Sequence, residues 1–141
     1  MPAYEEGVKD LLVAAGVGVF ASQSGFGIFI GPEPTKPDTV ITVREFAGPG
    51  PMARWRIDFP SIQVMVRGAP GGYQAAKAKA QAVLDELHSI PSQDLNGDRW
   101  NSIIATSGPG YLGLDESDRP KFAVNFKLII EPATGTHRFP L

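Results

Sequence analysis

Residues 61–87 read SIQVMVRGAPGGYQAAKAKAQAVLDEL, and their hydrophobic period changes in the middle. Residues 61–67 alternate with a period of two, which predicts a strand with Ile62, Val64 and Val66 on one face. After the Pro-Gly-Gly break at 70–72, apolar residues recur every three or four positions, which predicts a helix of about sixteen residues. The apolar stripe of this helix consists of Tyr73, Ala76, Ala80, Val83, Leu84 and Leu87. Its alanines permit close packing, so we expect the helix to lie on a sheet that contains the preceding strand.

Further strands surround this unit in the sequence. Residues 121–130 read KFAVNFKLII and place alternate apolar residues on one face, which predicts a strand about 34 Å long in the centre of the sheet. Residues 39–46, TVITVREF, are rich in β-branched residues and become charged at the end, so we expect a strand that runs out into solvent. Residues 25–31 and 99–106 complete the predicted set of strands.

A first helix is predicted over residues 4–15, where apolar residues follow the helical spacing. Gly16 is placed to end it in a left-handed cap. The predicted order is therefore helix, three strands, helix, two strands. This order indicates an α+β fold with a mixed, largely antiparallel sheet and two helices packed on one face. We expect a single domain over residues 1–141, with a long loop at 47–60 and a short C-terminal tail at 132–141.

Composition and charge exclude several classes of function. The 141 residues include no cysteine, which excludes disulfides and thiolate chemistry and fits a reducing compartment. The net charge of -2 argues against a nucleic-acid-binding protein, because such proteins usually have a basic face. No apolar run approaches the roughly 20 residues that cross a bilayer, and the acidic N-terminal segment is not typical of a signal peptide. We therefore expect no contact with a membrane.

Two short motifs imitate ligand sites. Residues 16–21 fit G-x-G-x-x-A, but a dinucleotide site needs a strand before the glycines and a helix after them, whereas a helix is predicted before them. Residues 94–98, DLNGD, resemble the start of a calcium loop, but glycine and glutamate are missing from its sixth and twelfth positions. Asn96-Gly97 is better explained as a tight hairpin turn. We therefore predict no catalytic, cofactor-binding or metal-binding residue and no enzymatic activity.

The long loop carries large side chains, which is unusual for a passive connection. Tryptophan and arginine are enriched in the energetic centres of protein interfaces. Composition alone leaves two interpretations open: a partner-binding surface, or surface charges beside a core tryptophan. The candidate assembly interface consists of Arg44, Met52, Arg54, Trp55, Arg56 and Phe59.

Four pieces of the sequence, in order, carry a resemblance to a known family. They are the helix that ends at Gly16; the strand IFIG at 28–31 with the following prolines; PSIQVMVRG at 60–68 with its alanine-rich helix; and the turn Tyr111-Leu112-Gly113 with Arg119 and the strand 122–130. With this order the chain resembles the minor capsid or tail terminator family of long-tailed bacteriophages. The resemblance covers nearly the whole chain.

The resemblance implies a structural virion protein that forms a ring of six copies. Such a ring caps the last ring of the tail tube, stops its polymerisation and joins the head-side connector. The implied partners are further copies of the chain, the major tail tube protein and the head-tail connector, with DNA passing through the ring without specific binding. The implied location is the head-proximal end of the tail, after assembly in the bacterial cytoplasm. The alternatives are a head-completion or tail-tube protein of the same virion, or a small-molecule-binding α+β domain that uses the G-x-G segment.

Overall fold

The computed structural model describes residues 3–22, 25–46, 57–88 and 90–132. These residues form two helices and seven strands, so the α+β class is confirmed. In chain order the elements are α1 (Tyr4–Ala14), β1 (Val19–Phe20), β2 (Gly27–Ile30), β3 (Val40–Phe46), β4 (Ser61–Arg67), α2 (Tyr73–Leu87), β5 (Gln93–Leu95), β6 (Asp98–Leu114) and β7 (Pro120–Glu131).

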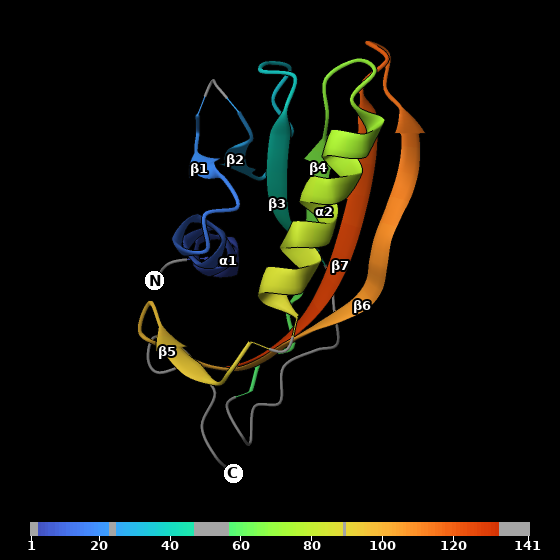
Figure 1. Ribbon diagram of the computed structural model, residues 1–141. Coiled ribbons are helices and arrows are strands. Elements are labelled where there is room, and N and C mark those ends of the chain that lie inside the picture. The colour runs from blue at the N-terminus through green and yellow to red at the C-terminus, as the bar shows by residue number, and fades with distance from the viewer. Residues whose placement is uncertain (1–2, 23–24, 47–56, 89, 133–141) are drawn as a thin grey trace.

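All seven strands join one sheet in the order β1-β2-β3-β4-β7-β6-β5 (Figure 1). The pairs β1–β2 and β2–β3 are parallel, and the other four pairs are antiparallel. The sheet is therefore mixed, with its antiparallel part built around β4 and β7. In these two central strands Val64 lies opposite Val124, and Ile62 lies opposite Phe126.

The predicted bounds of β4 and α2 are confirmed, as is the stripe that buries α2 against the sheet. Ala76, Ala80, Val83 and Leu87 are buried, and small alanine side chains let the helix approach the strands closely. Two residues of the predicted stripe are exceptions: Tyr73 is 38% exposed, and Leu84 is only half-buried. The helix thus turns Leu84 toward its exposed flank on the β6 side, where it lines a groove described below.

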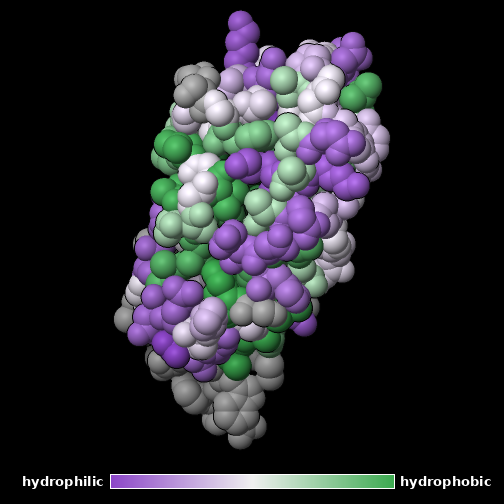
Figure 2. Space-filling model, in the orientation of Figure 1, coloured by the Kyte–Doolittle hydropathy of each residue, from purple (hydrophilic) through white to green (hydrophobic). Residues whose placement is uncertain are grey.

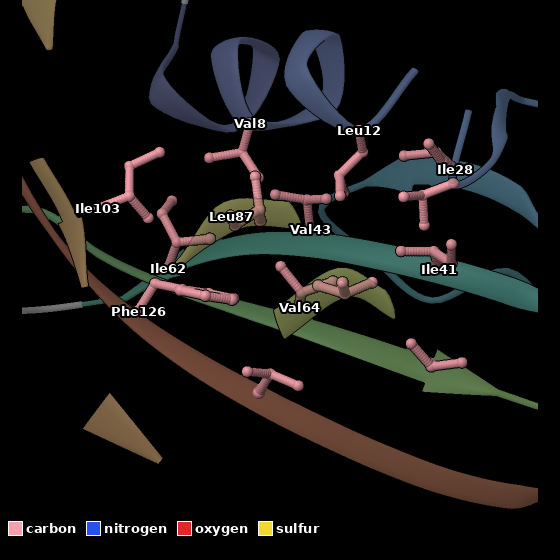
Figure 3. Close-up of a cluster of buried hydrophobic side chains, with 14 of the residues drawn as sticks. Val8, Leu12, Ile28, Ile41, Val43, Ile62, Val64, Leu87, Ile103 and Phe126 are labelled. Atoms are coloured by element: carbon pink, nitrogen blue, oxygen red, sulfur yellow. The ribbon is translucent and has the colours of Figure 1, made fainter. Parts of the chain in front are cut away.

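The core lies between the helices and one face of the sheet. In Figure 3, Val8 and Leu12 of α1 point toward Val43 of β3, and Leu87 of α2 lies close to them. Both helices contribute to the same buried cluster, so they cover the same face. The described residues contain no helix long and apolar enough to cross a membrane.

Helix α1 ends as the sequence predicts, and this ending explains the G-x-G segment. Gly16 has a φ of +75°, a conformation that glycine adopts without steric cost. The Gly16 and Val17 N–H groups donate to the carbonyls of Val13 and Leu12, which satisfies the end of the helix. A helix therefore precedes the glycines and strand β1 follows them, the reverse of the order that a dinucleotide site requires.

Strand β6 departs most from the sequence prediction. It extends from Asp98 to Leu114, whereas the sequence predicted a strand over residues 99–106 and a turn at Tyr111-Leu112-Gly113. The predicted turn is wrong: these residues continue the strand and pair with the start of β7. Four shifts of register interrupt the β6–β7 pairing, and they allow Gly108, Pro109 and Gly110 to lie within the strand.

Two short strands were not predicted, namely β1 and β5. Strand β5 forms a hairpin with the start of β6 in which Leu95 lies opposite Asp98. The two residues between them are Asn96 with a φ of +52° and Gly97 with a φ of +86°, so the predicted hairpin turn is confirmed. Residues 94–98 are therefore the tip of a hairpin, with the turn at 96–97.

Candidate assembly surfaces

The predicted assembly interface lies only partly in the described residues. Met52, Arg54, Trp55 and Arg56 fall outside the residues that the structure describes, while Arg44 and Phe59 are described. Arg44 lies near the end of β3, and Phe59 precedes β4 by two residues. Because Phe46 of β3 pairs with Ser61 of β4, the structure brings Arg44 and Phe59 to the same end of the sheet.

Arg44 is half-buried and lies on the sheet face that the helices do not cover, since the neighbouring Val43 points into the core. Its Nη2 atom lies 3.5 Å from Gln63 Oε1 and 3.9 Å from Met65 Sδ, which are long, weak contacts. Beside it, partial burial and the nearby carboxylates of Glu5 and Asp58 raise the pKa of Glu45 above its ordinary value. Arg44 therefore retains donors that are not held by strong acceptors among the described residues.

Phe59 is held against β7 at the end of the long loop. The Nζ atom of Lys127 lies 5.6 Å from the centre of its ring, a cation–π contact. The preceding residue, Asp58, exchanges backbone hydrogen bonds of 2.8 and 3.0 Å with Ile130. Tyr4 also donates a side-chain hydrogen bond to the Asp58 carboxylate. Residues 57–60 thus extend the β4–β7 pairing, which corrects the predicted end of the loop.

A buried charge network lies at the opposite end of β4, and sequence reasoning did not find it. Arg67 is only 2% exposed, and the alternation in residues 61–67 places it on the face opposite Ile62, Val64 and Val66. Its guanidinium donates to Glu33 Oε1 at 2.7 Å and to the carbonyl oxygens of Pro37 at 2.6 Å and Asp38 at 3.0 Å. Burial raises the pKa of Glu33, but hydrogen bonds from Lys121 and Arg67 outweigh burial and hold this pKa below its ordinary value.

Arg119 holds the same loop from the other side. Its Nη1 atom donates to Thr35 O at 2.7 Å and lies 3.3 Å from Asp38 Oδ1, while its Nε donates to Asp115 Oδ2 at 2.8 Å. Asp115 also accepts from the backbone N–H groups of Ser117 and Arg119, as a turn-forming aspartate does. Burial raises the pKa of Asp115, but these hydrogen bonds outweigh it and leave the pKa lowered. The acidic turn therefore has a structural role that its own contacts explain.

One outer edge of the sheet is open along most of β6. Strand β5 covers β6 only from Asp98 to Trp100, and among the described residues no other strand pairs with its outer side. No charged residue occurs from Asn101 to Leu114. Three large side chains in this strand, which we call the β6 patch, are strongly exposed: Tyr111 (48%), Leu112 (55%) and Leu114 (58%).

The other edge of the sheet is β1, which pairs only with β2 among the strands of the described chain. Val19 and Phe20 are 63% and 51% exposed. Lys9 of α1 lies 4.8 Å from the centre of the Phe20 ring, and the exposed Val13 follows Lys9 by one helical turn. We call Val13, Val19 and Phe20 the β1 patch. Figure 2 shows hydrophobic residues gathering on the side of the molecule where α1, β1 and β2 lie.

A groove of about 510 Å³ lies between the end of α2 and β6. Leu84, Asp85 and His88 line it from the helix, and residues 105–108 line it from the strand. The His88 Nδ1 atom accepts a hydrogen bond of 3.0 Å from the Ala105 N–H. His88 therefore caps one backbone donor of the β6 edge, and beyond Ala105 the edge carries no such cap among the described residues.

Comparison with known proteins agrees with this architecture. Residues 11–132 match the family described as "Bacteriophage tail terminator protein". A chain in a solved structure titled "Virion of native gene transfer agent (GTA) particle" has a similar fold, with a TM-score of 0.71 and 19% sequence identity. The similarity covers 92% of this chain and 95% of that chain. No match was found among curated proteins. Because the family match spans most of the sequence and both open edges of the sheet, the chain belongs to the bacteriophage tail terminator protein family.

Proposed function

We propose that this protein is the tail terminator of a long-tailed phage or a phage-like particle. It caps the last ring of the tail tube, stops tube polymerisation and forms the joint to the head-side connector, as a ring of six copies. The observation that carries the proposal is the family match over residues 11–132. The fold of the gene transfer agent chain supports it, since that chain has the same architecture over nearly its whole length.

The architecture suits a protein that acts through surfaces. Two edges of one sheet expose large apolar side chains. Residues 47–60, which connect β3 to β4 in the sequence, carry Met52, Arg54, Trp55, Arg56 and Phe59. Such a protein acts by binding neighbouring proteins and catalyses no reaction. The head-completion and tail-tube alternatives use the same kind of surfaces, so an assembly assay has to separate the three.

That assay adds the purified protein to tail tube protein during its polymerisation, with electron microscopy of the products. A terminator gives short tubes with one capped end, and their length falls as more protein is added. A tail-tube protein extends the tubes or polymerises alone, and a head-completion protein binds head connectors and leaves tube length unchanged. Either of these last two results would show that the proposed function is wrong and that the corresponding alternative is correct.

The role of the long loop is tested with the two tryptophans of the chain. We expect Trp55→Ala to leave the free energy of unfolding nearly unchanged and to abolish capping, because Trp55 belongs to the proposed interface with Arg44, Met52, Arg54, Arg56 and Phe59. The matched control is Trp100→Ala: Trp100 is 2% exposed, and its removal should cost about 3–5 kcal/mol of stability. If Trp55→Ala costs as much as Trp100→Ala and has no separate assembly defect, Trp55 is a core residue and the loop is not the interface.

A further inference from the structure

The two open edges of the sheet differ in shape but share one unusual property. Edge strands normally carry charged residues, which prevent them from pairing with other chains. Here the chain has no charged residue from Asn101 to Leu114 on one edge, nor from Leu11 to Pro32 around the other. Each edge instead exposes large apolar side chains, the β6 patch and the β1 patch. Both edge segments thus lack charges of their own; their remaining protection is the short length of β1, the contact of Lys9 with Phe20, and Pro109 with the register shifts of β6.

The backbone groups of the two edges are also available. At β1, the N–H groups of Val19 and Ala21 donate to the carbonyls of Phe26 and Ile28, so the N–H and C=O groups of the residue between them, Phe20, point away from the sheet. Along β6, the described residues beyond Ala105 have β7 on one side only. An edge with unpaired donors and acceptors binds another edge through main-chain hydrogen bonds, while its exposed apolar side chains gain by burial.

Charged side chains lie near both edges, and beside β1 they include Lys9 of α1 with its ion-pair partners Glu6 and Asp10. Lys79 of α2 lies on the β1 side, where its Nζ donates to Val17 O at 2.9 Å and lies 5.2 Å from the ring centre of Phe26. Asp85 lies on the other flank of the same helix and lines the groove beside β6. The Lys79 ammonium is therefore held within its own copy, and the charges near the two edges do not by themselves select a partner.

From these observations we propose that the β6 patch of one copy docks on the β1 patch of the next copy. The occupant of each edge is a second copy of this chain, because the ring proposed above is built from identical copies and the two patches lie at opposite ends of one strand order with matching apolar character. Two different patches that bind each other give head-to-tail contacts, which close into a ring when the rotation fits. This inference rests on the ring proposed above and names the surfaces that build it.

The test uses one lysine substitution in each patch. Leu112→Lys disables the β6 patch and Val19→Lys disables the β1 patch, and both residues are more than half exposed, so the fold should keep its melting temperature. Ala78→Lys, at an exposed position of α2, is the control for an added charge. The mass of each protein is measured by light scattering after size-exclusion chromatography, alone and after incubation with tail tubes.

We expect the unaltered protein and Ala78→Lys to form rings, and each patch variant to remain monomeric. An equimolar mixture of the two patch variants should give one-to-one dimers and nothing larger, because only one good pair of patches remains. If the Val19→Lys variant still dimerises alone, the contact joins two β6 edges and the proposal is wrong. Rings formed by both variants would overturn the named surfaces and leave the proposed ring intact. If the unaltered protein stays monomeric both alone and on tubes, the ring itself fails, and this inference fails with it.

Discussion

Replacing Arg67 by methionine should destabilise the fold more than any comparable change of an arginine in the described part of the chain. Arg67 donates four hydrogen bonds, to Glu33 Oε1 and to the carbonyl oxygens of Thr35, Pro37 and Asp38. Methionine fills similar space but donates none of them. Glu33 would keep Lys121 at 3.1 Å, and Thr35 would keep Arg119 at 2.7 Å.

The magnitude follows from what remains unpaired. Removing one partner of a buried ion pair costs about 3–5 kcal/mol, and the remaining contacts of Glu33 place Arg67→Met near the lower end of this range. Arg67→Lys keeps the charge but lacks the planar fork of donors, so its loss of stability should be intermediate. The matched control is Arg99→Met, since Arg99 forms an exposed pair with Asp94 at 3.3 Å, and such pairs contribute about 0–1 kcal/mol.

Urea unfolding followed by circular dichroism measures all three variants, because domains of this size usually unfold in one step. The expected order of stability loss is Arg67→Met, then Arg67→Lys, then Arg99→Met. A loss below about 1 kcal/mol for Arg67→Met, equal to that of Arg99→Met, would show that the buried network contributes little and that the reasoning is wrong.

Three further predictions concern acid stability and packing. The lowered pKa values of Glu33 and Asp115 stabilise the fold above the ordinary carboxyl pKa, and this stabilisation is lost as the pH falls through the lowered values. Glu33→Gln should therefore make the acid limb of a curve of stability against pH shallower. The raised pKa of Glu45 acts in the opposite direction. Gly7→Ala should cost about 1–3 kcal/mol in thermal unfolding, because its Cβ would lie 2.3 Å from Trp100 Cζ2, whereas Gly108→Ala meets no atom within 4 Å and serves as the control. Leu87→Ala should cost about 2–5 kcal/mol and Leu84→Ala clearly less, and equal losses would contradict the half-buried position of Leu84.

The sequence predicted those parts of the fold that have a strong hydrophobic period. Strand β4 and helix α2 have the predicted bounds, because alternation in residues 61–67 and a three-to-four spacing in residues 73–87 each bury one face. Strands β1 and β5 have two and three residues, which is too short for a period to be visible. The middle of β6 contains Ser-Gly-Pro-Gly at 107–110, which is typical of a turn, but an edge strand tolerates proline because its outer N–H groups need no partner.

The site was predicted less completely, for a physical reason. The sequence placed Arg44 and Phe59 in one candidate interface, and both lie at the same end of the sheet. It did not show that Arg67 is buried, because nothing local indicates that Glu33 and the carbonyls of residues 35–38 surround it. The open edges were missed too, since an edge exists only once the strand order is known. The long uncharged runs 11–32 and 101–114 were the available signal for them.

The contacts of Arg67 and Arg119 have a consequence for how this family can diverge. Of the six hydrogen bonds that these two side chains donate to residues 33–38, four go to main-chain oxygens. Every amino acid supplies a carbonyl oxygen, so substitutions at Thr35 or Lys36 leave the acceptors in place. During evolution residues 33–38 can therefore acquire different exposed side chains as a binding partner changes, while their backbone keeps the same course across the end of the sheet.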